Sequence, residues 1–384
     1  GLPKTIGADL SNPDVMYWAD AQFVFAAFDG ARFTNLFTHQ VSSGWWRGRG
    51  IDDVCVITLA QSEADPQRLY AGLYDLGIWR SLDGGNSWQP GNNGSFTGKW
   101  KGHGGNATAI VADPERPDVV WATSGEKNNL AELVLLRSTK AAQCSSWTAS
   151  TGLPRGFIAG MSLDRTSPAA RRTLFVTDAG NVYRSQDDGQ SWSLVFDPGF
   201  CRITAVDRFN GRIVYAGGEG GLWRSTRGGD QGSWVRIGNA EMSGTSTYAI
   251  DGFRWPGVHA IVPDVKETGK VYVVSYGTDH GLYRSADQGA TWTKLRTGSY
   301  FRELAIDPRD PGTLYLTSSR AYKSGGKAAD SEGVLRSTDG GRTWGPWNEG
   351  LAWPFAGPIL VDAGASNRVY VGSPGTGFFR RTIR

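Results

Sequence analysis

The chain has 384 residues, and its 40 basic and 37 acidic residues leave a formal net charge of only +3. The basic residues are dispersed rather than gathered in a stripe, which argues against a nucleic-acid partner. No apolar run is long enough to span a membrane, and 53 glycines with 16 tryptophans are typical of short strands and tight turns. We therefore predict an all-β protein without a nucleic-acid or membrane partner.

In chain order, a turn phrase built on Asp and Pro recurs, and an aromatic residue follows it in the next strand. The phrase begins at Ala8, Ala112 and Ile306, and the aromatic markers are Tyr17, Tyr70, Trp121, Phe175, Tyr215, Tyr272, Tyr315 and Tyr370. A spacing of about 40 to 57 residues suits the four-stranded antiparallel blades of a β-propeller. We predict one β-propeller domain over residues 1–384 with eight blades, or seven if a terminal unit lies outside the ring.

Each unit contains four expected strands, for example residues 54–59, 68–72, 77–81 and a fourth that starts at Trp88. The last unit differs because the chain ends soon after its third strand, at residues 378–381. Two closures are therefore expected. Either a three-stranded blade closes the ring, or the residues around Gly1 supply the missing strand.

The third and fourth strands are joined by a repeated hairpin with the pattern Ser-x-Asp-x-Gly-x-Ser/Thr-Trp. Clean copies cover residues 81–88, 185–192, 285–292 and 337–344, and degraded copies lie in 28–33, 138–147 and 225–234. The Asp can accept backbone N–H groups of its own turn, the Gly supplies a positive φ and the Trp packs inward. This motif resembles the Asp box of sialidases, of the family-74 glycoside hydrolases that cut xyloglucan, and of sortilin-type receptors. The resemblance implies a propeller and gives these aspartates a structural role.

The loops that join one unit to the next are expected on the face opposite the Asp boxes, and they are rich in aromatic and arginine residues. Flat aromatic faces stack on sugar rings, and polar groups between them bind hydroxyls or carboxylates. We predict a groove for a polysaccharide or oligosaccharide. Its candidate binding residues are Trp45, Trp46, Arg47, Asp53, Trp100, Arg254, Trp255, His259, Tyr300, Arg302 and Trp353.

Acidic residues occupy the loops between second and third strands, on the same expected face. They are Asp20, Asp75, Glu126, Asp178, Glu219, Asp279, Asp330 and Glu332. A glycosidase needs two carboxylates across the scissile bond, so the leading prediction is a glycoside hydrolase that uses Asp20 with Asp75 or Asp178. The stretch from Tyr17 to Gln22 is similar to a sequence of the family-74 xyloglucanases that contains an essential aspartate. This resemblance implies that Asp20 has the role of that aspartate in this chain.

Two other functions stay open. In the first, His103 is the general base of a lyase that cleaves next to a uronic acid, with Arg47, Arg254 or Arg302 neutralising the carboxylate and Tyr276 or Tyr300 nearby. Propeller lyases that act on uronic-acid polysaccharides are broadly similar to this arrangement of residues. In the second, the ring is a binding platform without catalysis, as in sortilin-like receptors and photosystem assembly factors.

The remaining signals concern cofactors and location. Cys55, Cys144 and Cys201 have no metal-ligand spacing, and we expect buried free thiols. No phosphate loop, zinc motif or serine triad is present, so we expect no cofactor, although a structural calcium ion on a loop stays open. The start at Gly1 without an initiator Met or a signal peptide favours a processed, secreted protein or a trimmed chain; we expect a secreted monomer.

Overall fold

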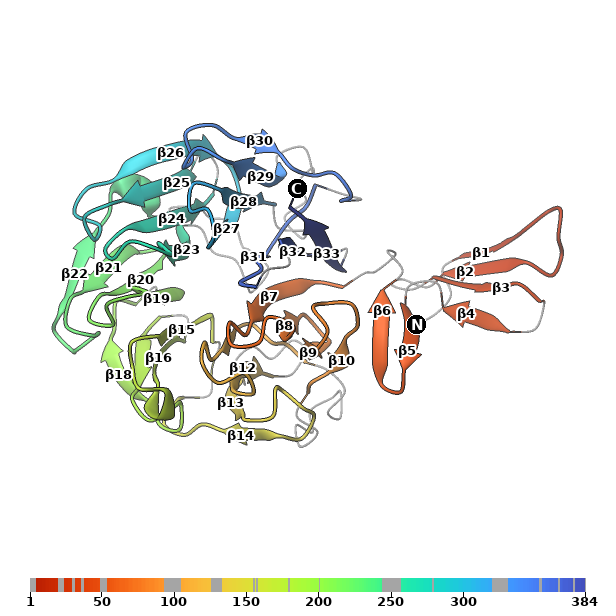
Figure 1. Cartoon of the computed structure of the whole chain (residues 1–384), viewed down its shortest axis with the longest axis horizontal. Helices are drawn as coiled ribbons and strands as arrows, with labels where there is room; N and C mark the ends of the chain where they lie inside the picture. The colour runs from red at the N-terminus through yellow and green to blue at the C-terminus, as the bar shows by residue number, and fades with distance from the viewer. Residues whose placement is uncertain are drawn as a thin grey trace.

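The computed structural model shows a ring of antiparallel sheets with a further sheet outside it (Figure 1). It describes residues 5–19, 24–29, 32–35, 38–48, 54–92, 105–125, 133–154, 156, 158–178, 180–199, 201–243, 257–277, 280–319, 331–351, 354–364, 367–375 and 377–383. Each sheet of the ring takes its strands in sequence order, from the axis to the rim. The predicted all-β propeller of four-stranded antiparallel blades is confirmed.

Seven sheets form the ring. The first three blades are β7 (Val56–Gln61), β8 (Leu69–Leu73), β9 (Gly77–Ser81) and β10 (Gln89–Pro90); β11 (Ile110–Ala112), β12 (Val120–Ser124), β13 (Val134–Ser138) and β14 (Trp147–Ala149); β15 (Gly160–Asp164), β16 (Thr173–Thr177), β17 (Val182–Ser185) and β18 (Ser193–Phe196). A short 3-10 helix, η2 (Ala169–Arg171), lies between β15 and β16.

The other four blades complete the ring. They are β19 (Ile203–Val206), β20 (Val214–Gly218), β21 (Gly221–Ser225) and β22 (Trp234–Ile237); β23 (Gly257–Pro263), β24 (Val271–Tyr276), β25 (His280–Ser285) and β26 (Thr293–Gly298); β27 (Phe301–Ile306), β28 (Leu314–Ser318), β29 (Gly333–Ser337) and β30 (Gly345–Pro346); β31 (Ile359–Val361), β32 (Arg368–Ser373) and β33 (Gly377–Thr382). A second 3-10 helix, η3 (Ala240–Met242), follows β22. Successive first strands contact one another around the axis, and β31 contacts β7.

The remaining repeat unit, the first in the chain, forms a sheet of its own outside the ring. It contains β1 (Thr5–Ala8), β2 (Met16–Ala19), β3 (Val24–Ala27) and β4 (Phe33–Asn35), and the hairpin of β5 (Thr38–Ser42) and β6 (Trp45–Gly48) lies between this sheet and the ring (Figure 1). Its marker aromatic Tyr17 is 44% exposed, whereas the equivalent Tyr70 of the first blade is fully buried. All eight predicted units therefore form sheets, and seven of them make up the ring.

The seventh blade has three strands, the first of the two closures expected, and the ring closes through side chains and backbone contacts. Gln61 of the first blade donates to Asp362 Oδ1 of the seventh at 2.8 Å and accepts the backbone N–H of Ala363 at 2.8 Å. Trp88 and Phe378 stack across the same seam with ring centroids 4.8 Å apart. Both Gln61 and Asp362 are buried, so their polar groups depend on each other.

We expect Gln61→Ala to lower the free energy of unfolding by about 2 kcal/mol, because it removes both bonds and weakens the bonding of a buried carboxylate. Urea unfolding followed by tryptophan fluorescence measures this loss. Gln67→Ala is the matched control, since Gln67 is an exposed glutamine of the same blade. Equal stability of the two variants would show that the Gln61 contact does not hold the seam.

The Asp boxes have the predicted structural geometry. Asp339 accepts the Thr343 hydroxyl at 2.6 Å, the Thr343 backbone N–H at 2.9 Å and the Ser337 hydroxyl at 2.8 Å. These bonds, that of the Thr343 side chain first, hold the pKa of Asp339 below its usual range. Gly341 has a φ of 88°, as the turn requires. The box carboxylates are occupied by their own turns and are poorly placed for chemistry.

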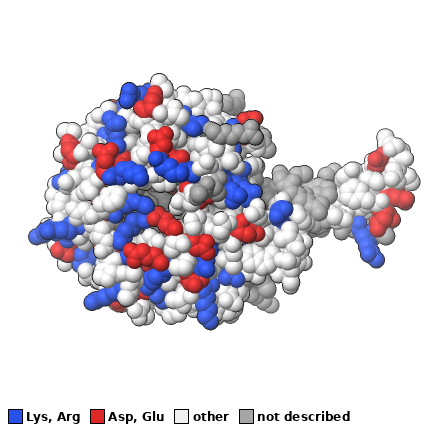
Figure 2. All heavy atoms as spheres, in the orientation of Figure 1, with Lys and Arg blue, Asp and Glu red and all other residues white. Residues whose placement is uncertain are grey.

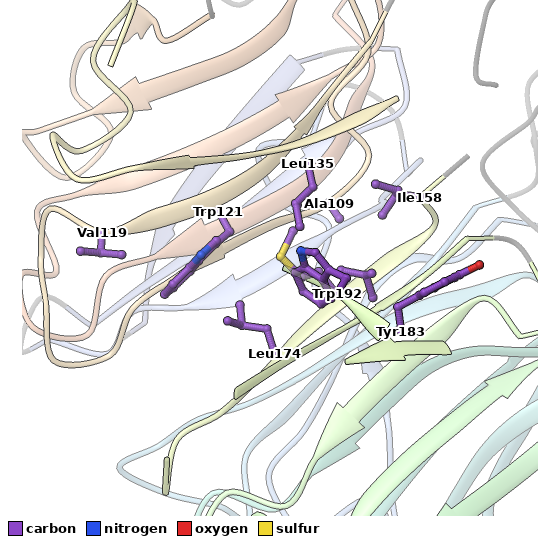
Figure 3. Packing of buried hydrophobic residues seen from close by; sticks show 10 residues of the cluster. Ala109, Val119, Trp121, Leu135, Ile158, Leu174, Tyr183 and Trp192 are labelled. Atoms are coloured by element: carbon purple, nitrogen blue, oxygen red, sulfur yellow. The ribbon is translucent and has the colours of Figure 1, made fainter. Parts of the chain in front are cut away.

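The box tryptophans fill the interfaces between blades. In the cluster between the second and third blades, Trp192 packs with Trp121, Leu135, Leu174 and Tyr183. Figure 3 shows Trp192 near the middle of this cluster, with Trp121 on one side and Tyr183 on the other. The Trp121 indole N–H also donates to the backbone oxygen of Asp188 at 2.9 Å. The box tryptophan of one blade therefore packs against the preceding blade and stabilises the interface between them.

Charged residues of both signs are interspersed over the visible face of the ring (Figure 2). Two ion pairs that share Glu63 join separate blades on the box face, where Glu63 of the first blade accepts from Arg165 of the third at 2.6 Å and Arg208 of the fourth at 3.0 Å. Burial would raise the pKa of Glu63, but the two guanidinium groups hold it below its usual value. These contacts join the first, third and fourth blades on the box face.

All three cysteines are free thiols, but only Cys201 is buried. Cys144 is exposed and Cys55 half-buried, so the expectation of buried thiols is wrong for Cys144. Burial raises the pKa of Cys201 to about 12, which makes it unreactive. Within the described ranges, no helix is long and apolar enough to cross a membrane.

Candidate functional site: the axial cavity opposite the Asp boxes

Two classes of loop meet on the face opposite the Asp boxes, as the strand order requires. Gly77, which follows the second-to-third loop of the first blade, donates its N–H to the Gly105 oxygen of the next inter-blade loop at 2.9 Å. Tyr300 and Gly277 make the corresponding bond, also at 2.9 Å, between the sixth and fifth blades. The inter-blade loops thus lie beside the second-to-third loops.

A cavity of about 140 Å³ lies among the first strands near this face. Its lining comes from the first six blades: Ile57, Thr58, Thr108, Ala109, Ile110, Ala159, Gly160, Met161, Arg202, Ile203, Val258, His259 and Glu303. Most of these side chains are apolar or small, so the three ionisable groups Arg202, His259 and Glu303 stand out. They come from three consecutive blades.

His259 is held in a defined orientation on β23. Its Nδ1 lies 2.8 Å from the backbone oxygen of Arg302, and because a carbonyl only accepts, Nδ1 carries the proton. The imidazole ring lies 5.3 Å from the ring of Tyr276, which lies 5.6 Å from that of Tyr300. Tyr300 has a φ of 58°, an unusual backbone conformation for a bulky residue. This aromatic row fixes the imidazole beside the cavity.

Glu303 is a carboxyl group whose pKa is strongly altered by its surroundings. Burial raises its pKa to about 7, against an ordinary value of 4.5, and the positive charge of Arg302 only partly opposes this. Arg302 itself is buried, donates from Nε to the Ser319 oxygen at 2.9 Å and lies over the Phe355 ring at 5.8 Å. Glu303 is therefore largely protonated at slightly acidic pH and can donate a proton.

Glu219 is connected to the same cavity through Arg202. The Arg202 Nε lies 3.4 Å and its Nη2 3.5 Å from the two oxygens of Glu219, which belongs to the turn between β20 and β21. A carboxyl group whose pKa is raised by burial and a carboxyl group that faces a guanidinium are two environments suited to different roles in acid and base chemistry. No cluster of metal ligands is formed by the residues described.

The predicted catalytic aspartates that the structure describes lie in turns on this face. Asp178 accepts the Tyr183 hydroxyl at 3.0 Å and the backbone N–H groups of Gly180 and Asn181 at 3.2 and 2.8 Å. Asp75 has a φ of 70°, and its backbone N–H donates to the side-chain oxygen of Asn106 at 3.1 Å. Neither residue is among those that line the cavity, so their catalytic role stays a prediction.

The predicted binding residues separate into two groups. His259, Tyr300 and Arg302 lie together beside the cavity. Trp45, Trp46 and Arg47 belong to β6, which lies at the rim of the first blade. There Trp46 forms a bridge with Trp88, and Arg47 donates to the Asn86 oxygen at 2.8 Å. The β6 group is thus beside an Asp box, away from the cavity.

Several predicted site residues lie outside the described residues. They are Asp20, His103, Asp53, Trp100, Arg254, Trp255 and Trp353. Their predicted roles are untested.

The sequence-based predictions did not include Glu303 or Arg202. The predicted acids were those of the second-to-third loops, and neither residue lies in such a loop. A signal was present nonetheless. Both lie at or next to the start of first strands, Glu303 within Phe301–Ile306 and Arg202 directly before Ile203–Val206. A charged residue there borders the axis of the ring.

Fold and boxes together define the class of the protein as an Asp-box β-propeller. No family model matches the chain. A xyloglucanase from Paenibacillus sp. is 30% identical over 273 residues, covering 67% of this chain and 23% of the relative. The chain is a xyloglucanase-like β-propeller, a distant homologue of the family-74 glycoside hydrolases.

Solved structures agree on the fold. The family-74 xyloglucanase from Xanthomonas campestris matches with a TM-score of 0.66 at 20% identity, covering 99% of this chain and 50% of that one. YCF48 from Cyanidioschyzon merolae matches with a TM-score of 0.59 at 15% identity, covering 86% of this chain and 96% of that one. YCF48 has also been solved bound to D1 peptide. The chain spans about half or less of these two xyloglucanases but nearly all of YCF48.

Proposed function

We propose that the chain is the propeller of a secreted glycoside hydrolase acting on a plant cell-wall glucan of the xyloglucan type. The distant relationship to xyloglucanases supports the substrate class. The observation that carries the proposal is Glu303, a carboxyl with a pKa of about 7 in a cavity on the face opposite the Asp boxes. A raised pKa is what a general acid needs in order to protonate a leaving oxygen near neutral pH.

In this proposal Glu303 donates the proton to the glycosidic oxygen, and Glu219 is the second carboxylate, oriented by Arg202. His259 and the aromatic row behind it position the sugar. The cavity of about 140 Å³ accepts only a small part of a chain, so the rest of the glucan lies along the loops of this face. An extracellular location follows from the polymeric substrate.

The test is release of reducing ends from xyloglucan by the purified chain and its variants. We expect Glu303→Gln to lower the rate at least about 100-fold, because a general acid contributes about 10²- to 10⁴-fold. Glu332→Gln is the matched control, since Glu332 lies in the same blade and pairs with Arg296. Full activity of Glu303→Gln would remove the proposed acid. Release of unsaturated uronates from acidic polysaccharides would instead favour the lyase. In this chain His259 lies close to Arg302 and lines the same cavity as Arg202.

A second candidate is a binding platform without catalysis. The specific observation in its favour is the extent of the match to YCF48, of which the chain covers 96%. Affinity electrophoresis in xyloglucan separates the two candidates when no reducing ends appear. Retardation without turnover would support a glycan-binding platform, whereas neither effect on a broad panel would contradict a glycan function altogether.

A further inference from the structure

The ionisable side chains that line the axial cavity mainly donate hydrogen bonds. The guanidinium of Arg202 has only donors, and Glu303 adds an O–H donor whenever it is protonated. His259 carries its proton on Nδ1, which donates to the Arg302 oxygen at 2.8 Å, so the neutral ring has an acceptor at Nε2. A ligand group that only accepts hydrogen bonds, such as a carboxylate, therefore suits Arg202 and the protonated Glu303.

The charges around the cavity also favour an anion. The described groups that lie in or beside it are Arg202, Arg302, His259, Glu303 and Glu219. Arg202 and Arg302 are cationic, whereas Glu303 is largely neutral below pH 7 because burial raises its pKa to about 7. Within this set Glu219 offsets the two cations, and it faces Arg202 at 3.4 and 3.5 Å, longer than a tight charge-assisted bond. The set therefore keeps a positive charge in surroundings where electrostatic attraction is stronger than in water.

The cavity has the size of one sugar unit. Its volume of about 140 Å³ is roughly ten times what one water molecule needs, which is comparable to a sugar ring with its substituents. Apolar side chains such as Ile110, Met161 and Val258 line it beside the polar ones, as suits the C–H groups of a sugar ring. A matching ligand combines a carboxylate with a compact and partly apolar body, and hexuronic acids have this combination.

We propose that the axial cavity is a binding site for a hexuronic acid, whose carboxylate pairs with Arg202 and accepts the O–H of Glu303. The sugar ring lies against the apolar wall, and one of its hydroxyls donates to Nε2 of His259. This inference goes beyond the proposed hydrolase, because a neutral glucan carries no carboxylate. Binding is measured without turnover, so failure of this inference and failure of the proposed function are separate results.

The test is isothermal titration calorimetry of the full chain with D-glucuronate at pH 6. We expect saturable binding, with D-glucose, acetate and inorganic phosphate each at least about tenfold weaker, because none of them combines a carboxylate with a sugar ring. Absence of saturable glucuronate binding would overturn the proposal. Acetate or phosphate binding as tight as that of glucuronate would also overturn it, because the cavity would then be a general anion site.

An oligosaccharide that ends in glucuronate separates two sources of the ligand. Binding tighter than that of the free acid would make the ligand the end of a polymer, whose further sugars contact the loops of this face. Binding weaker than that of the free acid would make the ligand a free sugar acid.

Variants of the chain locate the site. Arg202→Gln should weaken glucuronate binding at least about tenfold, because it removes charge-assisted hydrogen bonds. Arg202→Lys keeps the charge but not the planar fork and should bind with intermediate affinity. Arg212→Gln is the matched control, since Arg212 is an exposed arginine of the same blade and the charge change is the same. Equal affinity of Arg202→Gln and Arg212→Gln would show that the ligand does not pair with Arg202.

The pH dependence of binding tests the part played by Glu303. Between pH 6 and pH 8 the protonated fraction of a group with a pKa of about 7 falls about tenfold, and glucuronate binding should weaken by the same factor. Glu303→Gln keeps an N–H donor and does not ionise, so its affinity should stay level over this range. An equal decline in Glu303→Gln would assign the pH dependence to His259 and contradict the bond from Glu303.

Discussion

Replacing Arg172 by methionine is expected to lower the free energy of unfolding by about 3 to 5 kcal/mol. Arg172 is fully buried and donates to both oxygens of the buried Asp113, at 3.0 and 3.1 Å, and to the Ser167 oxygen at 2.5 Å. The pair joins the second blade to the third. Asp113 keeps the guanidinium of Arg116, at 2.7 and 2.9 Å, but the variant removes one of the two cations that compensate this buried carboxylate together with the hydrogen bonds of Arg172, which is the costly case.

The dependence of the free energy of unfolding on acidic pH should also change in the Arg172→Met variant. Burial would raise the pKa of Asp113, but hydrogen bonds, that from Arg172 first, lower it to about 2 from 3.8. The carboxylate therefore adds stability that is complete above pH 3.8 and is lost as the pH falls toward 2. In Arg172→Met this part of the pH dependence should shrink.

Urea unfolding at pH 7 and at several acidic pH values measures both effects. Arg171→Met is the matched control, because Arg171 is the exposed neighbour and its guanidinium donates to the Gln186 oxygen at 2.7 Å. Arg172→Lys keeps the charge and tests whether the paired geometry is needed. An Arg172→Met protein as stable as the Arg171→Met protein would contradict the expected role.

Glu303→Gln is expected to stabilise the protein at neutral and alkaline pH while it lowers the rate at least about 100-fold. In the folded wild type burial raises the pKa of Glu303 to about 7, whereas the unfolded chain keeps 4.5. Between these values the folded state binds more protons than the unfolded state, so stability falls as the pH rises and then stays level above about 7. The total loss is at most about 3 kcal/mol, reduced where water reaches the half-buried carboxyl.

The neutral amide of the variant does not ionise, so its stability should lack this decline. The difference between variant and wild type, measured as urea midpoints from pH 4.5 to 8, should grow with pH and level off near pH 7. Glu332→Gln, which removes a carboxyl paired with Arg296, should not reproduce this profile. A flat difference across this range would show that Glu303 ionises normally.

The repeat by itself determined much of the fold. Box residues such as Ser337, Asp339 and Thr343 bond within one hairpin, so their geometry follows from local sequence. The marker aromatics counted the units correctly because each unit repeats the same strand and turn. The missing strand of the last blade was also readable from the end of the repeat.

Other features depended on contacts between distant residues. Glu303 and Arg202 share a cavity only because the ring brings their strands to one axis, and the pKa of Glu303 reflects burial that no local pattern reports. Trp46 lies beside Trp88 because β6 runs along the rim of the first blade. The sequence by itself therefore determined the blades, whose bonds are local, and the tertiary structure decided which loops and charges meet, because ring closure sets those distances.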